Sequence, residues 1–127
     1  HLVIISDMNG QAGTDAAKKI LKMVPRPDGI FTSNDSSAVA AIVELERAGV
    51  NIPDDIAVVG FNNEPIRKVI KPNLTKIDYL AREIGELAAI SLINKLKNSQ
   101  SADFSSIILK HKLISRQSSI RIGTIKN

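Results

Sequence analysis

The sequence contains no cysteine and is poor in histidine and in aromatic residues. Without cysteine the chain can form no disulfide, no thiol nucleophile and no thiolate metal site. Only His1 and His111 offer an imidazole, so we expect no metal site built from several histidines. Aromatic residues make up 3% of the 127 residues, which argues against a base-stacking surface for single-stranded nucleic acid.

Long apolar runs are missing as well. No stretch approaches the roughly 18 apolar residues of a membrane-spanning helix, and no secretion signal pattern opens the chain. The chain begins on an apolar run rather than on methionine, so we expect a piece of a longer protein or a processed one. The formal charge of +4 permits binding to nucleic acid, but it is more typical of an ordinary solvated surface.

Short apolar runs alternate with amphipathic stretches along the first half of the chain. This pattern predicts strands at residues 2–6, 29–33 and 56–61. It also predicts two helices, one capped by Thr14 and ended by Pro25, the other capped by Asp35 and reaching about residue 48. The order of elements indicates an α/β fold with a parallel sheet of βαβ units flanked by helices.

The second half has a different pattern. A long helix is predicted over residues 80–96, and its apolar residues spread around most of its circumference, so we expect apolar contacts on more than one side. The remaining predicted elements are a short basic helix at 66–70, a polar loop at 98–106, and strands at 74–78, 107–109, 113–114 and 119–123.

Polar side chains follow the first three predicted strands, where the carboxyl ends of parallel strands form one edge of the sheet. Ligands of open α/β sheets bind outside that edge. The resulting candidates for a small-molecule site are Asp7, Met8, Asn34, Asp35, Asn62 and Asn63. Asn and Asp also cap helices and form turns. We favour the capping role for Asp35, the packing role for Met8, and the ligand role for Asn62.

Common enzyme signatures are absent. The sequence has no glycine-rich phosphate loop, no Gly-x-Ser-x-Gly elbow and no His-Glu-x-x-His motif. The carboxylate pair Asp54–Asp55 precedes a strand at the opposite edge of the sheet, and His111 lies in an alternating stretch, so both are expected to be solvated. Arg116 could bind an anion or pair with a carboxylate. We therefore expect a protein that is not an enzyme and needs no cofactor or metal.

Four segments, in the same order along the chain, resemble the C-terminal part of the effector-binding domain in the LacI/GalR family of bacterial transcription regulators. These segments are Pro27–Phe31 with Asn34, Asp35 and Ala38; Gly49 with Ile52–Phe61; Pro72–Thr75; and Leu113–Ser118. The resemblance implies one lobe of a periplasmic-binding-protein-like type I fold, in which a ligand lies between two α/β lobes. It further implies that residues 1–78 and 112–127 form the C-terminal lobe, and that 79–111 pack on an absent N-terminal lobe.

The same resemblance implies a function. The whole protein would be a cytoplasmic homodimer that binds operator DNA through an absent N-terminal helix-turn-helix headpiece and senses a small-molecule effector, expected to be a carbohydrate. Asn34 and Asn62 match the family's ligand positions best, and Met8 matches a place where an apolar side chain stacks on the ligand. The family commonly has Asp where this chain has Asn62, which leaves the effector open.

The sequence alone leaves two other functions open. An extracytoplasmic solute-binding protein shares this fold, and an α/β enzyme is a third possibility that the missing nucleophile–base pair disfavours. The Leu113–Ser118 ending favours the regulator. A helix-turn-helix or a signal peptide encoded upstream would decide between the first two.

Overall fold

A four-stranded mixed sheet forms the centre of the molecule. The computed structural model describes residues 2–61, 70–97 and 106–121. Strands β1 (Gly29–Phe31), β2 (Ala57–Phe61) and β3 (Thr75–Asp78) are parallel neighbours, and β4 (Lys112–Ile114) pairs antiparallel with β3. The predicted α/β fold with parallel βαβ units is confirmed.

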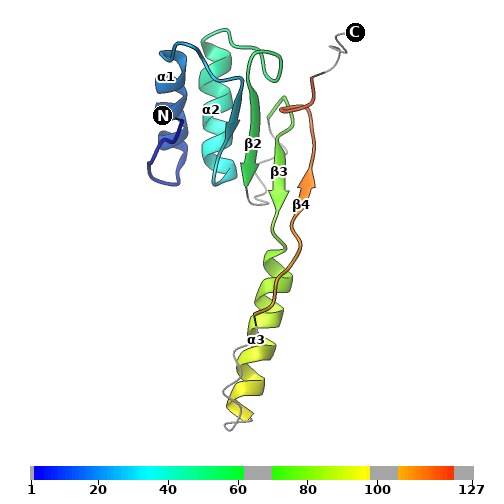
Figure 1. Cartoon of the computed structure of the whole chain (residues 1–127). Coiled ribbons are helices and arrows are strands. Elements are labelled where there is room, and N and C mark those ends of the chain that lie inside the picture. Colours follow the sequence, from blue (N-terminus) through cyan, green and yellow to red (C-terminus); the bar gives the residue numbers. More distant parts are fainter. Residues whose placement is uncertain (1, 62–69, 98–105, 122–127) are drawn as a thin grey trace.

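Two of the three helices belong to the sheet, and the third extends away from it. Helices α1 (Gly10–Leu21) and α2 (Asp35–Arg47) lie side by side next to β1 and β2 (Figure 1). Helix α3 (Ala81–Lys97) continues beyond β3, and residues 106–111 return alongside it (Figure 1). The predicted long helix is thus confirmed, and α3 has no buried residue in this structure.

Both sheet-side helices begin one residue after an asparagine. Asn9 Oδ1 accepts a hydrogen bond from the Ala12 amide at 2.9 Å, and Asn34 Oδ1 accepts one from the Ser37 amide at 2.7 Å. The predictions that Thr14 and Asp35 are the caps are therefore wrong. Thr14 lies inside α1, where its hydroxyl donates to the Gly10 carbonyl at 3.3 Å. The asparagine side chains are the caps because their amide oxygens reach a backbone N–H in the first turn that has no partner within the helix.

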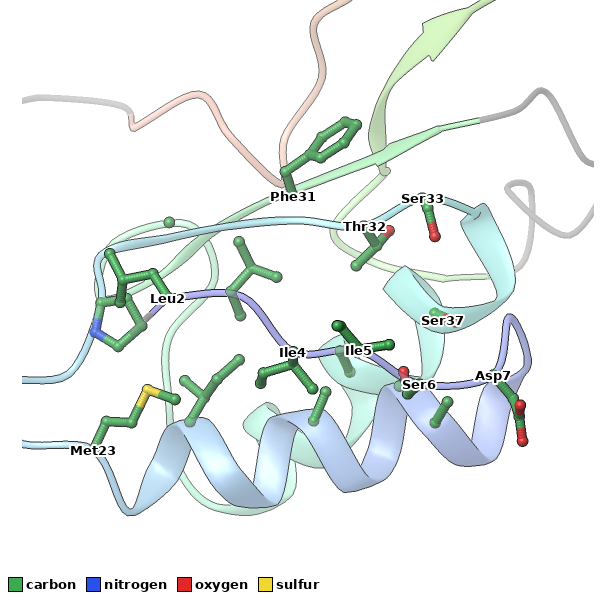
Figure 2. Close-up of a pocket in the computed structure, with 18 residues that line it drawn as sticks. Leu2, Ile4, Ile5, Ser6, Asp7, Met23, Phe31, Thr32, Ser33 and Ser37 are labelled. Atoms are coloured by element: carbon green, nitrogen blue, oxygen red, sulfur yellow. The ribbon is translucent and has the colours of Figure 1, made fainter.

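The strand predicted at residues 2–6 is wrong. These residues run alongside β1, but they are not paired with it, and a cavity of about 300 Å³ lies between them, α1 and β1 (Figure 2). Leu2 and Ile5 are 81% and 92% exposed, whereas Ile4 of the same run packs against the core.

Several strands predicted nearer the C-terminus also differ from the structure. Residues 107–109 and 119–121 form no strand, because their chain lies outside the hydrogen-bonded sheet. The rest of the strand predicted at 119–123 lies outside the described residues, as do residues 66–69 of the predicted basic helix and most of the polar loop. Strand predictions at 56–61, 74–78 and 113–114 are confirmed within a residue or two.

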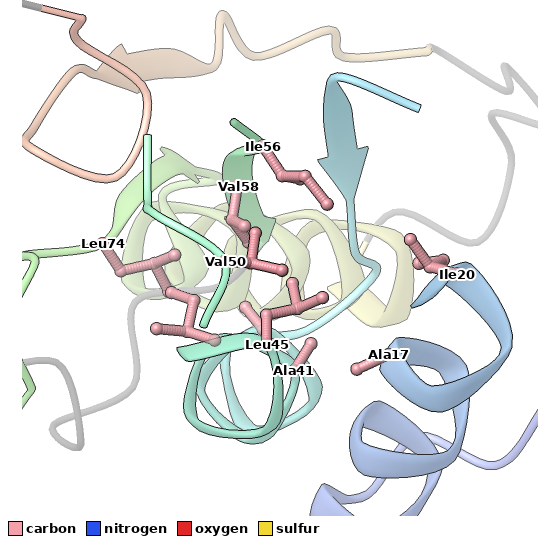
Figure 3. Close-up of a cluster of buried hydrophobic side chains, with 10 residues drawn as sticks. Ala17, Ile20, Ala41, Leu45, Val50, Ile56, Val58 and Leu74 are labelled. Atoms are coloured by element: carbon pink, nitrogen blue, oxygen red, sulfur yellow. The ribbon is translucent and has the colours of Figure 1, made fainter. Parts of the chain in front are cut away.

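The hydrophobic core lies between α1, α2 and the sheet (Figure 3). Helix α2 contributes the largest share through Ala38, Ala41, Ile42 and Leu45. The sheet and its connections contribute Val50, Ile56, Val58 and Leu74, and α1 contributes Ala17 and Ile20. Each fully buried Val, Leu or Ile side chain stabilises the fold by about 1.5–3 kcal/mol. This core fixes α2 against β2 and thereby fixes the ends of the strands.

Helices α1 and α2 approach so closely at Gly13 that a side chain there would collide with the Ser37 carbonyl. We predict that Gly13→Ala lowers the free energy of unfolding by about 1–3 kcal/mol, the usual cost of forcing extra volume into a packed contact. Gly85→Ala in α3 is the matched control, because nothing lies within 4 Å of that position. It should stabilise the protein by about 0.5–1 kcal/mol through helix propensity. Urea denaturation that shows equal effects would contradict this account.

Candidate functional site

The carboxyl ends of β1, β2 and β3 lie at one edge of the sheet, because the three strands are parallel and in register. Phe31, Phe61 and Asp78 are the last residues of these strands. Asn34 and Asp35 follow β1 at this edge, and both are buried. Asn62 and Asn63 lie outside the described residues, so their predicted role stays a prediction.

The side-chain oxygen of Asn34 makes a hydrogen bond within the fold, whereas its side-chain nitrogen makes none with the described residues. Its Oδ1 caps α2, and its backbone carbonyl accepts a hydrogen bond from the Thr32 hydroxyl at 2.8 Å. Its Nδ2 is buried and has no acceptor among the described residues. A buried donor without an acceptor costs about 1–3 kcal/mol. An oxygen atom of a bound molecule would recover that energy.

Asp35 is directed into the lobe rather than toward its open edge. It is fully buried at the first turn of α2, and a methyl group on Gly60 would come within 2.5 Å of its Oδ1. The carboxylate therefore occupies space that any other residue at position 60 would fill. Its negative charge also lies at the positive end of the α2 dipole, which stabilises it.

The other two sequence candidates lie before α1. Asp7 lines one end of the cavity, next to Ser6 and near Ser33 and Ser37, whereas the opposite end is apolar (Figure 2). Met8 is 65% exposed and is not among the residues that line this cavity. The structure thus places Asp7 beside α2 but does not bring Met8 into a site.

Sequence reasoning missed an aromatic cluster at this edge. The Phe61 ring stacks on Tyr79 at 5.6 Å and makes edge contacts with Phe31 at 6.4 Å and with His111 at 6.2 Å, all between ring centroids. Three of the chain's four aromatic residues are gathered here. The sequence did contain a signal, because Phe31 and Phe61 both fall at the predicted ends of strands. The low aromatic content of the whole chain drew attention away from it. Such ring faces can pack on the C–H faces of a ligand.

The opposite edge of the sheet is held together by the C-terminal segment. The buried Ser118 hydroxyl donates to the Val58 carbonyl at 2.6 Å and accepts from the Thr75 amide at 2.8 Å. The Arg116 guanidinium donates to the Leu74 carbonyl at 2.9 Å, so this arginine ties the segment to β3. The Leu113–Ser118 motif therefore has a structural role, and nothing in its contacts shows an anion site.

The carboxylate pair at that edge also has a structural explanation. Asp54 and Asp55 are both exposed, as expected. Asp55 accepts hydrogen bonds from the Asn51 backbone and side-chain amides at 2.8 and 3.0 Å, and these bonds lower the pKa of its carboxyl group. Asp55 therefore closes a turn. Within residues 2–61, 70–97 and 106–121 no cluster of acidic or histidine side chains could hold a metal ion. In those ranges no helix is long and apolar enough to cross a membrane.

Comparison with known proteins identifies the lobe. The periplasmic binding protein-like domain matches residues 2–119. This chain belongs to that family. It is 36% identical over 110 residues to the NTD biosynthesis operon regulator NtdR of Bacillus subtilis, a match that covers 87% of this chain and 33% of NtdR. The sequence resemblance to LacI/GalR regulators is thus confirmed, and the chain spans about a third of such a curated relative.

Solved structures agree with this assignment. A putative LacI transcriptional regulator from Bacillus cereus subsp. cytotoxis superimposes with a TM-score of 0.84 at 27% identity, over 90% of this chain and 40% of that one. A LacI family regulator from Enterococcus faecalis with bound ribose gives a TM-score of 0.81 at 28% identity, over 91% of this chain and 42% of that one. The periplasmic-binding-protein-like fold is therefore shown for this chain.

The two atoms of the Asn34 side chain can be tested separately. Asn34→Ser should keep the cap, since serine caps helices about as well as asparagine, yet it removes the Nδ2 donor. Asn34→Ala removes both the cap and the donor, so its free energy of unfolding should be about 1 kcal/mol below that of Asn34→Ser. Asn9→Ala, which removes the cap of α1, is the matched control for the loss of a cap. Chemical denaturation that finds Asn34→Ala as stable as Asn34→Ser would refute the capping role.

Proposed function

We propose that this chain is the effector-sensing part of a LacI-type transcription regulator. The observation that carries the proposal is the buried Asn34 amide, with a donor that no described residue satisfies, at the ligand-binding edge of a periplasmic binding protein-like lobe. An edge of this kind binds small molecules in open α/β sheets. The whole protein would be cytoplasmic, would catalyse no reaction, and would bind operator DNA through an N-terminal headpiece outside this chain.

The position of α3 supports the proposed division into lobes. Residues 1–78 and 112–127 would form the C-terminal lobe, and 79–111 would pack on an N-terminal lobe outside this chain. In support, α3 exposes Ile84, Ile90, Leu92, Ile93 and Leu96, and exposed apolar surface that gathers on one element marks an interaction site. A second lobe that packs on α3 would close over the strand ends and complete the effector site.

A carbohydrate is the effector that suits this edge best. Sugar hydroxyls accept hydrogen bonds, and the Asn34 Nδ2 is a buried donor that needs an acceptor. The Enterococcus faecalis relative was solved with ribose, which supports a sugar as the class of ligand. Asn34 would contact the effector together with Asn62 and Asn63, while Asp7, Met8 and Asp35 would line or support the site. Effector binding would shift lobe closure and, in a homodimer, the spacing of the headpieces.

The regulatory function predicts two different results with DNA. The full-length protein should bind a DNA site near its own gene with sequence selectivity, and a sugar should change that affinity. The isolated 127-residue chain should show at most weak, salt-sensitive binding, since it carries no recognition-helix unit. Gel-shift assays at physiological salt measure both. Sequence-selective binding by the isolated chain, or a full-length protein with no selective site, would count against the proposal.

The lobe assignment predicts that the isolated chain self-associates through α3. Two copies that bury Ile84, Leu87 and Leu92 against each other gain several kcal/mol, at about 1.5–3 kcal/mol for each fully buried side chain. Leu92→Glu should restore a monomer in analytical ultracentrifugation at micromolar concentration. Lys18→Glu, which adds negative charge on exposed α1, is the control and should leave the association unchanged. A monomeric wild-type chain would overturn this prediction.

A further inference from the structure

Helix α3 is joined to the sheet by two segments of chain. Residues 79–80 lead from β3 into α3, and residues 106–111 return alongside the helix to β4 (Figure 1). Helix α3 has no buried residue, so little packing fixes its direction relative to the sheet. That direction therefore depends on the contacts that the two joining segments make with the strand ends.

One aromatic ring contacts both joining segments. The Phe61 ring, at the end of β2, stacks on Tyr79 with 5.6 Å between the ring centroids and 16° between the ring planes. The His111 ring, directly before β4, meets the Phe61 ring edge-on at 6.2 Å. Phe31, which is 61% exposed at the end of β1, makes a further edge contact with Phe61. Stacked and edge-to-face pairs of rings are stabilising, so Phe61 holds both segments at the sheet.

The residue after Tyr79 has an unfavourable backbone conformation. Among the described residues other than glycine, only Leu80 has a positive φ, of 55°. This left-handed conformation brings the Cβ atom of an L-amino acid close to the following carbonyl oxygen, and leucine lacks the short polar side chain that compensates in asparagine. The Leu80 carbonyl accepts a hydrogen bond from the Ile84 amide at 3.0 Å in the first turn of α3. A change of conformation at Leu80 would therefore turn the whole helix.

We infer that the stack of Tyr79 on Phe61 couples an effector at the strand ends to the direction of α3. This inference rests on the proposed function, and it adds the route by which the site would act on the second lobe. The stack holds Leu80 in its left-handed conformation, and loss of the stack lets Leu80 relax to a right-handed or extended one. A sugar that packs on the exposed Phe31 ring or on Phe61 acts on the same group of rings. The two conformations of Leu80 are the two states that such a sugar would bias.

The first test measures the direction of α3 in the full-length protein and needs no ligand. This chain has no cysteine, so Lys19→Cys on α1 and Lys97→Cys at the end of α3 place two spin labels at exposed positions, once any cysteine outside the chain is replaced. Double electron–electron resonance then gives the distribution of distances between the labels. Tyr79→Leu should shift or broaden that distribution, because it removes the stacked ring and keeps an apolar side chain.

Two variants serve as matched controls. Tyr79→Phe removes the hydroxyl group but keeps the ring, and Phe31→Leu removes a ring of the same cluster that lies on β1, outside the joining segments. Both should leave the wild-type distribution unchanged. His111→Leu removes the edge contact of the second segment from an exposed position, so it should broaden the distribution without unfolding the protein. It provides a second test should Tyr79→Leu fail to fold.

The strain at Leu80 allows a rescue experiment. Asparagine adopts the left-handed conformation more readily than leucine, so adding Leu80→Asn to Tyr79→Leu should restore the wild-type distribution. A wild-type distribution in Tyr79→Leu would refute the role of the stack, as would an equal change in Tyr79→Phe. A double variant that stays shifted would refute the role of Leu80.

The second test measures coupling with ribose as the probe. At saturating ribose, the full-length wild-type protein should change its affinity for its selective DNA site by about fivefold or more, and Tyr79→Leu should reduce that change to within about twofold. Saturation removes any effect of the substitution on the affinity for ribose itself. A full ribose response in Tyr79→Leu would overturn the coupling while the proposed function stands. A wild-type protein with no selective DNA site, or with none that ribose affects, would instead count against the proposed function, and the label distances would still decide the role of the stack.

Discussion

Helix α2 can lie against β2 only because residue 60 has no side chain. Gly60 leaves the space that the Asp35 carboxylate fills. Leu74, the residue before β3, closes the same gap, because a methyl group on Gly60 would come within 2.9 Å of its Cδ2. This contact sets the position of the first turn of α2, and with it the position of the Asn34 cap. The polar edge of the sheet therefore depends on buried side chains that pack against the bare backbone of Gly60 and not on surface side chains.

The asparagine before α2 links the fold to the proposed site. One amide oxygen satisfies a helix N–H, and the nitrogen of the same amide remains buried without a described acceptor. Because the cap holds the side chain in place, its nitrogen is already oriented before any ligand arrives. Preorganised donors of this kind lose little entropy on binding. The same reasoning explains why an amide suits this position better than a longer, more mobile donor.

Sequence patterns predicted the elements that a local apolar pattern specifies. The apolar stripe of α2, the continuous run before Gly60 and the apolar residues of α3 all specified elements that the structure confirms. The same patterns failed at the helix caps, where Asn9 and Asn34 accept the hydrogen bonds expected of Thr14 and Asp35, and at residues 2–6, which form no strand. The burial of Lys76 and the ring contacts of the aromatic cluster could not be predicted, since both arise from strand register across distant parts of the chain.

The central claim is that small molecules bind at the carboxyl ends of β1–β3. Its most direct test is a titration of the isotope-labelled full-length protein with ribose and ribose 5-phosphate, followed by nuclear magnetic resonance. The account predicts that the Asn34 side-chain amide shifts together with the backbone amides of Ser33 and Phe61. Shifts confined to the opposite edge, around Asn73 and Gln117, would contradict it.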